Sequence, residues 1–201
     1  LEEPQPLPLL RNTLATIVEK DVPQVLRLSV QEIPAVRRVL EFVGRSAVDG
    51  INPTSVAANA GITKYKASRY LSALESAFVV QRVMPAGTNV LREPKILLVP
   101  PVRILFRSEE EAVGGLREDF FALAMRQAGI AFSYLKGTRG QKTPDFLVVH
   151  EGEKIAMEVG GKGKGRSQFK DMRDLRRIIF APDAVPSPSR VPLHLLGFLK
   201  D

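Results

Sequence analysis

The chain has 201 residues, of which 44% are hydrophobic and 25% are charged, enough for one large domain or two small ones with a buried core. It contains no cysteine and two histidines, so disulfides, thiol catalysis and cysteine-ligated zinc are excluded and a histidine-based triad is disfavoured. The formal net charge of +7 is compatible with a polyanionic partner, and also with a basic protein whose charge serves only its solubility.

Membrane insertion is not expected from the sequence. No apolar run approaches the roughly 20 residues needed to span a bilayer, and the first residues do not have the pattern of a signal peptide. We therefore predict a cytoplasmic protein without a membrane partner.

The first part of the chain contains prolines at positions that indicate a linker and helix boundaries. Residues 1–8 are Pro-rich and lack an initiator Met, which is typical of a linker and indicates a fragment of a longer protein. Residues 9–47 carry apolar side chains at i, i+3, i+4 and i+7, which predicts helices. Pro23 and Pro34 interrupt this region, and Pro34 suits the first turn of a helix.

The next segment has the pattern of a helix-turn-helix. Asn52 and Pro53 predict the N-cap and first turn of one helix. Gly61 then predicts a tight turn, and Thr63 the N-cap of a second helix over residues 64–77. One stripe of this second helix is apolar and comprises Ala67, Tyr70, Leu71, Leu74 and Phe78.

The second helix would be the recognition helix, which enters the major groove in helix-turn-helix proteins. Its polar face carries Lys64, Lys66 and Arg69, and we expect these three side chains to contact nucleic acid. Such a unit also occurs as a protein–protein module, in which Tyr65 and Tyr70 would simply pack.

Two strand-like runs follow the second helix. They span residues 78–84 and 95–99, and residues 86–89 form a turn-like sequence between them. This order predicts a winged helix.

A change of composition divides the chain in two. Pro100 and Pro101 make a break, and an acidic, Gly-containing stretch follows at residues 108–115, where we place the domain boundary. We therefore predict a linker (1–8), a helical and winged-helix domain (9–107) and a second domain (108–201).

The second domain alternates strands with two helices. The predicted elements are a helix at 116–127, a strand at 130–136, a basic loop at 137–142, strands at 143–150 and 154–160, a helix at 167–179 and a strand at 191–199. The order α-β-β-β-α-β, after the helical domain, predicts a two-domain chain of the α+β or α/β class.

Two carboxylates fall on neighbouring strands of this domain. Asp145 opens one strand and Glu158 lies near the end of the next, so the two can face one another across a hairpin. Because a buried lone carboxylate is costly, the pair predicts a site for a hard cation such as Mg²⁺, to which Glu118 on the preceding helix would add a third acid. The alternative is an edge strand with ordinary surface acids.

A Gly-rich basic segment follows the second of these strands. Residues 160–167 nearly match the phosphate-binding pattern G-x-x-x-x-G-K-[ST], with Arg166 in the Lys position, but only 34 residues follow Ser167. That is too few for a nucleotide-binding sheet, so we expect no ATP to bind here. The alternatives are a solvated helix face and a phosphodiester-binding surface, whose cations would be Lys164, Arg166, Lys170 and Arg173.

The second domain resembles the PD-(D/E)XK nuclease superfamily, whose restriction-endonuclease-like core has the same order of elements. Asp145, after Pro144, resembles the PD step and Glu158 the (D/E) acid, while Glu118 and Gln168 are similar to residues that many members carry on flanking helices. The resemblance implies Mg²⁺-dependent cleavage of phosphodiesters. Since Gly160 occupies the position of the family's catalytic Lys, Lys162 would have to substitute for it.

The chain as a whole resembles the C-terminal region of archaeal and bacterial AAA-type ATP-binding proteins, without their ATPase module. The segments that carry this resemblance are residues 17–23, 56–62, 66–78, 92–98, 116–121, 143–147 and 157–162. It implies a part of an AAA-type protein that engages nucleic acid, preferably DNA, with a nuclease site that is intact or decayed. The alternative is a non-catalytic adaptor that docks the ATPase module or another protein.

Overall fold

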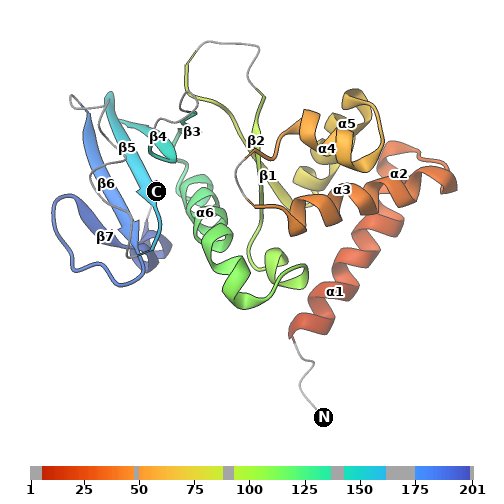
Figure 1. Cartoon of the computed structure of the whole chain (residues 1–201), viewed down its shortest axis with the longest axis horizontal. Helices are drawn as coiled ribbons and strands as arrows, with labels where there is room; N and C mark the ends of the chain where they lie inside the picture. The colour runs from red at the N-terminus through yellow and green to blue at the C-terminus, as the bar shows by residue number, and fades with distance from the viewer. Residues whose placement is uncertain (1–5, 48–49, 88–92, 137–142, 162–174, 200–201) are drawn as a thin grey trace. The chain divides into compact units, whose positions relative to one another are not determined.

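The chain is a mixed α+β protein with two compact units. The computed structural model describes residues 6–47, 50–87, 93–136, 143–161 and 175–199 (Figure 1). Unit 1 comprises residues 1–82 and 96–115, and unit 2 comprises residues 83–95 and 116–201. The second segment of unit 1 and the first of unit 2 are therefore interleaved along the sequence.

Unit 1 is mainly helical, as predicted for residues 9–47. Its helices are α1 (Pro6–Thr16), the π-helix η1 (Ile17–Asp21), α2 (Val22–Leu26), the 3₁₀ helix η2 (Val30–Glu32), α3 (Ile33–Arg45), α4 (Pro53–Ala60), α5 (Lys64–Ser76) and the 3₁₀ helix η3 (Val102–Leu105). Pro34 lies in the first turn of α3, as predicted. Helix α1 already begins at Pro6, inside the segment predicted to be a linker.

The turn between α4 and α5 follows its local sequence signals. The Asn52 side chain accepts a hydrogen bond from the Ser55 backbone N–H at 2.9 Å and caps α4. Gly61 ends α4 with φ of 65°, a left-handed conformation that favours glycine. Thr63 Oγ1 accepts the Lys66 backbone N–H at 3.2 Å and caps α5. Both predicted caps and the predicted turn are confirmed.

The apolar stripe of α5 is buried, except at its predicted end. Ala67, Tyr70, Leu71 and Leu74 all lie in the core of unit 1. The prediction for Phe78 was wrong, because this side chain is 82% exposed. Helix α5 ends at Ser76 and Phe78 has φ of 55°, so the helical spacing no longer sets its direction.

The segment predicted as the wing pairs with the sheet of unit 2. Strands β1 (Val80–Val83) and β2 (Lys95–Leu98) form the predicted two-stranded sheet. Beyond β1, the Tyr134 N–H donates to the Met84 carbonyl and the Ala86 N–H donates to the Tyr134 carbonyl, both at 2.9 Å. The Tyr134 hydroxyl also donates to the Glu93 carbonyl at 2.7 Å. Residues 88–92, which include the end of the predicted turn, lie outside the described part of the chain.

Helix α6 (Glu109–Gln127) is longer than the predicted helix. The helix was predicted to begin at residue 116, but it already begins at Glu109 and runs through Gly114 and Gly115, across the predicted domain boundary. Three glutamates in its first turn interact favourably with the positive end of the helix dipole. This effect, with the Ser108 hydroxyl accepting the Glu111 N–H at 3.5 Å, starts the helix early.

Unit 2 contains a five-stranded mixed sheet. Its order is β3 (Phe132–Tyr134), β4 (Phe146–His150), β5 (Glu153–Val159), β6 (Arg176–Ala181) and β7 (Arg190–Pro192). β3, β4 and β5 are antiparallel neighbours, whereas β6 pairs with β5 and β7 pairs with β6 in parallel.

Two sequence predictions fail at the end of the chain. The predicted helix at 167–179 lies partly outside the described residues, and its last four residues belong to strand β6 instead. Ile178, Ile179 and Phe180 are β-branched or aromatic, and pairing with β5 decides their conformation. The predicted strand at 191–199 ends at Pro192, which has no N–H to extend a ladder, and the 3₁₀ helix η5 (Leu193–Phe198) follows.

An aromatic cluster fixes α6 on one face of the sheet (Figure 1). The Phe121 ring of α6 stacks on the Phe146 ring with centroids 4.5 Å apart and planes at 17°. Phe121 also contacts Phe132 at 5.9 Å and Phe180 at 5.8 Å between ring centroids. Since side chains alternate along a strand, this cluster defines which residues of β4 and β5 face α6.

The close packing of Gly44 in α3 against Phe106 predicts that an alanine at this helix position destabilises the protein. A Cβ at Gly44 would lie 2.3 Å from Phe106 Cδ2 and 2.4 Å from its Cγ, so the whole ring would have to move. We expect Gly44→Ala to lower the free energy of unfolding of unit 1 by about 1–3 kcal/mol, despite the better helix propensity of Ala. Urea denaturation followed by circular dichroism measures this change.

Gly114→Ala is the matched control, because nothing lies within 4 Å of its added Cβ. This variant is expected to raise the free energy of unfolding by up to about 1 kcal/mol. A Gly44→Ala protein as stable as the Gly114→Ala protein would contradict the close contact between Gly44 and Phe106.

Candidate functional site

The two predicted carboxylates lie opposite one another on adjacent strands. Phe146 of β4 is paired with Met157 of β5, and the same antiparallel register places Asp145 opposite Glu158. Asp145 Oδ2 accepts a hydrogen bond from the Val159 N–H at 2.8 Å. The Asp145 carboxylate therefore continues the β4–β5 ladder beyond the start of β4 and is held in a fixed orientation.

Glu158 is fully buried in unit 2. It is paired with Ile179 of β6 across the parallel ladder, and both point away from the face that α6 covers. On this opposite face, Ala156 and Ile179 form a small apolar cluster, and the partly buried Leu175 packs against it. Burial of an ionisable group among apolar side chains is costly, which makes Glu158 a candidate for a functional role.

The third predicted acid has a cationic partner. Lys95 Nζ lies 2.7 Å from Glu118 Oε2, and the two side chains are only 10% and 13% exposed. The same ammonium lies 5.8 Å from the centre of the Phe146 ring, an arrangement that also stabilises the cation. No local sequence signal predicts this pair, because Lys95 and Glu118 are 23 residues apart.

The expected three-carboxylate cluster is not formed. Among the residues that the structure describes, no group of three or more histidines, aspartates or glutamates could hold a metal ion. Glu118 and Lys95 lie near Phe146, whereas Glu158 points to the opposite face of the sheet. The acids that remain together as a candidate metal site are Asp145 and Glu158.

The other predicted residues of this site cannot be placed. Lys162, Lys164, Arg166, Gln168, Lys170 and Arg173 all lie outside the described residues. Gly160, which occupies the position of the motif Lys, donates its N–H to the Phe180 carbonyl at 3.0 Å and extends the β5–β6 pairing.

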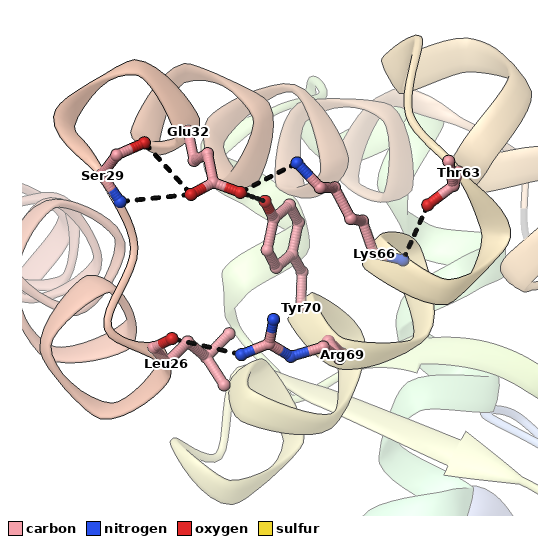
Figure 2. Close-up of polar contacts among 7 residues, drawn as sticks. All are labelled: Leu26, Ser29, Glu32, Thr63, Lys66, Arg69 and Tyr70. Atoms are coloured by element: carbon pink, nitrogen blue, oxygen red, sulfur yellow. Dashed lines mark hydrogen bonds and ion pairs between the residues drawn. The ribbon is translucent and has the colours of Figure 1, made fainter.

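The cations of the predicted recognition helix are engaged by a neighbouring segment of unit 1 (Figure 2). Lys66 Nζ lies 2.9 Å from Glu32 Oε1, and the Tyr70 hydroxyl lies 3.5 Å from the same oxygen. The other carboxylate oxygen of Glu32 accepts the backbone N–H of Ser29 at 3.2 Å and its hydroxyl at 3.1 Å. One carboxylate thus receives four donors.

These contacts shift the pKa values of the groups involved. The hydrogen bond from Lys66, followed by those from Ser29, lowers the pKa of Glu32 from 4.5 to about 2. The same carboxylate raises the pKa of Lys66 above its usual value. Burial raises the pKa of Tyr70, and the negative charge of Glu32 adds to this shift.

Arg69 also has partners within unit 1. Its Nη2 donates to the Leu26 carbonyl at 3.1 Å, and its guanidinium carbon lies 5.9 Å from the centre of the Tyr65 ring. Lys64 is exposed on the same helix. Lys66 and Arg69, both predicted to contact nucleic acid, therefore have partners within unit 1. The Ser29-x-x-Glu32 capping box was readable in the sequence, but its link to Lys66 was not.

Comparisons with known proteins identify no function. A family model described as a domain of unknown function (DUF8612) matches residues 2–99. No curated protein and no solved structure matches the chain. Among the described residues, no helix combines the length and apolar character needed to cross a bilayer.

The Lys95–Glu118 pair makes a prediction about stability. Lys95→Met leaves the Glu118 carboxylate nearly buried without its cation, and we expect this change to lower the free energy of unfolding by roughly 3 kcal/mol. The double variant Lys95→Met/Glu118→Leu should recover most of that loss, because it removes both charges. Urea denaturation of the two variants tests this, and a loss in Lys95→Met that the second change does not reduce would argue against the pair.

The Glu32 cluster predicts an acid-dependent loss of stability. A lowered pKa in the folded state means that the unfolded chain binds the proton more readily, so stability rises with pH in this range. The contribution of Glu32 is therefore complete above pH 4.5 and is lost as the pH falls toward about 2. Thermal melts across this range should show a weaker pH dependence for Glu32→Gln than for the wild type. Glu19→Gln, on an exposed carboxylate paired with Arg37, is the control.

Proposed function

We propose that unit 2 is a nuclease-like module that engages nucleic acid, and that the chain is the C-terminal part of an AAA-type ATPase family protein. The observation that carries this proposal is the placement of Asp145 opposite Glu158 at one end of β4 and β5. The cationic segment at residues 162–173 follows β5 directly in the sequence, where it would bind a phosphodiester backbone.

The order of the strands supports the proposal. Helix α6 precedes an antiparallel series β3, β4 and β5, to whose last strand β6 adds in parallel. The order α6, β3, β4, β5 agrees with the first four elements that the resemblance to PD-(D/E)XK nucleases implies, with Asp145 just before the second strand and Glu158 on the third. Most of the helix expected next lies outside the described residues. The order of elements also agrees with a winged-helix unit preceding the nuclease-like one, because α4, α5, β1 and β2 follow in that order.

The residues present fit a hard divalent cation. Asp145 and Glu158 supply carboxylate oxygens, and proteins commonly hold Mg²⁺ by one or two carboxylates while waters complete its shell. When bound, such an ion lowers the pKa of a coordinated water and stabilises charge on a phosphate. The Val159 N–H orients the Asp145 carboxylate, and the apolar neighbours of Glu158 keep solvent away from its side chain.

The alternative is a non-catalytic adaptor. It is favoured by Gly160 at the position of the motif Lys, and by the internal partners of Lys66 and Arg69. In that case α4 and α5 would dock a protein, with the ATPase module as the expected partner.

Divalent metal should stabilise the wild type and not the Asp145→Asn variant. Asparagine keeps a side-chain oxygen that can accept the Val159 N–H but removes the negative charge, so a lost response reports on charge rather than on folding. We expect Mg²⁺ or Mn²⁺ to raise the melting temperature of the wild type and of Glu153→Gln, and to leave Asp145→Asn and Glu158→Gln unchanged.

Glu153 is a suitable control because it lies on the same strand as Glu158, pairs with Arg176 at 3.5 Å and is 52% exposed. Incubation of plasmid DNA with the same four proteins and metal tests for cleavage. A metal-induced shift that persists in both Asp145→Asn and Glu158→Gln would exclude these acids as the site. A shift without cleavage would indicate a decayed nuclease.

A further inference from the structure

Residues 22–32, which we call the α2–η2 segment, lie against the predicted recognition helix α5 (Figure 2). Glu32 at its end pairs with Lys66, and the Leu26 carbonyl near its middle accepts a hydrogen bond from Arg69. The two contacts join residues that are 34 and 43 positions apart in the sequence, so they are tertiary contacts rather than contacts within one helix. They engage two of the three cations of α5 that are predicted to contact nucleic acid.

After its first turn the α2–η2 segment has no fully buried side chain, although Leu26 and Leu28 are partly buried against the core of unit 1. Val22 and Pro23 are buried, but no side chain between residues 24 and 31 is. Val25 and Val30 are 75% and 82% exposed. The polar contacts to α5 therefore hold the segment in place together with the partial burial of Leu26 and Leu28.

We propose that the α2–η2 segment is an intramolecular cover of α5, and that its displacement opens a phosphate-binding surface formed by Lys66, Arg69 and Tyr70. This inference rests on the proposed engagement of nucleic acid and assigns to it a closed state, in which the surface is occupied by the chain's own Glu32.

The chemistry of the Glu32 site is that of an anion site. From α5, the Lys66 ammonium and the Tyr70 phenol both direct donors at this one carboxylate. Phosphate oxygens accept the same charge-assisted hydrogen bonds. The carboxylate of Glu32 therefore occupies the position that a backbone phosphate would take, and only one of the two can be bound at a time.

The backbone on both sides of α2 departs from regular geometry. The five-residue π-helix η1 precedes it, and π-helical turns are uncommon and often mark functional positions. Arg27 follows it with φ of 52°, a left-handed conformation that is unfavourable for a non-glycine residue. These two positions flank α2, the first part of the segment that would move.

The test compares two variants that remove the same charge. Glu32→Gln and Glu19→Gln each delete one carboxylate and release one cation, Lys66 or Arg37, so their effect on the overall field is equal. The probe is a short fluorescein-labelled DNA duplex, titrated by fluorescence anisotropy at several salt concentrations. We expect Glu32→Gln to bind about tenfold more tightly than the wild type and Glu19→Gln to change affinity by less than about twofold.

Two further measurements separate displacement of the cover from a general charge effect. The double variant Glu32→Gln/Lys66→Gln should lose the gain in affinity, because the exposed cation is gone. In the wild type, saturation with the duplex should speed hydrogen exchange of the amides in residues 22–32, a readout that requires no variant to fold.

The possible outcomes decide between the two proposals. If Glu32→Gln gains no more than Glu19→Gln, or if exchange in residues 22–32 does not increase on binding, the cover is excluded while DNA binding by the wild type still supports the proposed function. If neither the wild type nor any variant binds the duplex at low salt, the cover and the engagement of duplex DNA both fail, and the adaptor remains.

Discussion

The register between β4 and β5 is the constraint on which the arrangement of unit 2 depends. Residues opposite one another in an antiparallel pair share a face, so pairing Phe146 with Met157 directs both toward α6 and directs Glu158 away from it. A slip of one residue would turn Phe146 away from Phe121 and bring a carboxylate into the aromatic cluster. The stacking of aromatic rings therefore favours the same register that sets the two acids opposite each other.

The contact between Asp145 and Val159 has two consequences for the candidate site. It satisfies a backbone N–H at the point where the β4–β5 ladder ends, which is a structural role. It also fixes the direction of a carboxylate beside a buried glutamate, as a metal site requires. The same orientation of the Asp145 side chain serves both roles, but only the metal site needs its negative charge. A structural acceptor works equally well as an amide, whereas a ligand for a divalent cation does not.

Sequence signals that act over a few residues predicted the structure well, and those that depend on distant partners did not. Asn52, Gly61 and Thr63 were placed correctly, because caps and turns are decided within four residues. Residues 176–179 were assigned to a helix, since only their pairing with β5 makes them a strand. The opposed placement of Asp145 and Glu158 was predicted from spacing, whereas the separation of Glu118 from them required the packing of α6.

The same distinction applies to charge. Counting basic residues suggested a cationic recognition helix, but Lys66 and Arg69 have partners 34 and 43 residues away in the same unit. Lys95 likewise forms an ion pair with the nearly buried carboxylate of Glu118. Lys66 and Lys95 each lie beside a carboxylate, so they add little to the field that attracts a polyanion. Arg69 donates to a neutral carbonyl and keeps its charge, but that contact holds its guanidinium against the chain. Engagement of nucleic acid would therefore depend either on the basic segment that follows β5 in sequence or on release of Lys66 and Arg69 from their internal partners. The affinity for nucleic acid would depend on salt differently in these two cases. Binding through Lys66 first requires the Glu32–Lys66 pair to break, and salt weakens both that pair and the phosphate contacts that replace it.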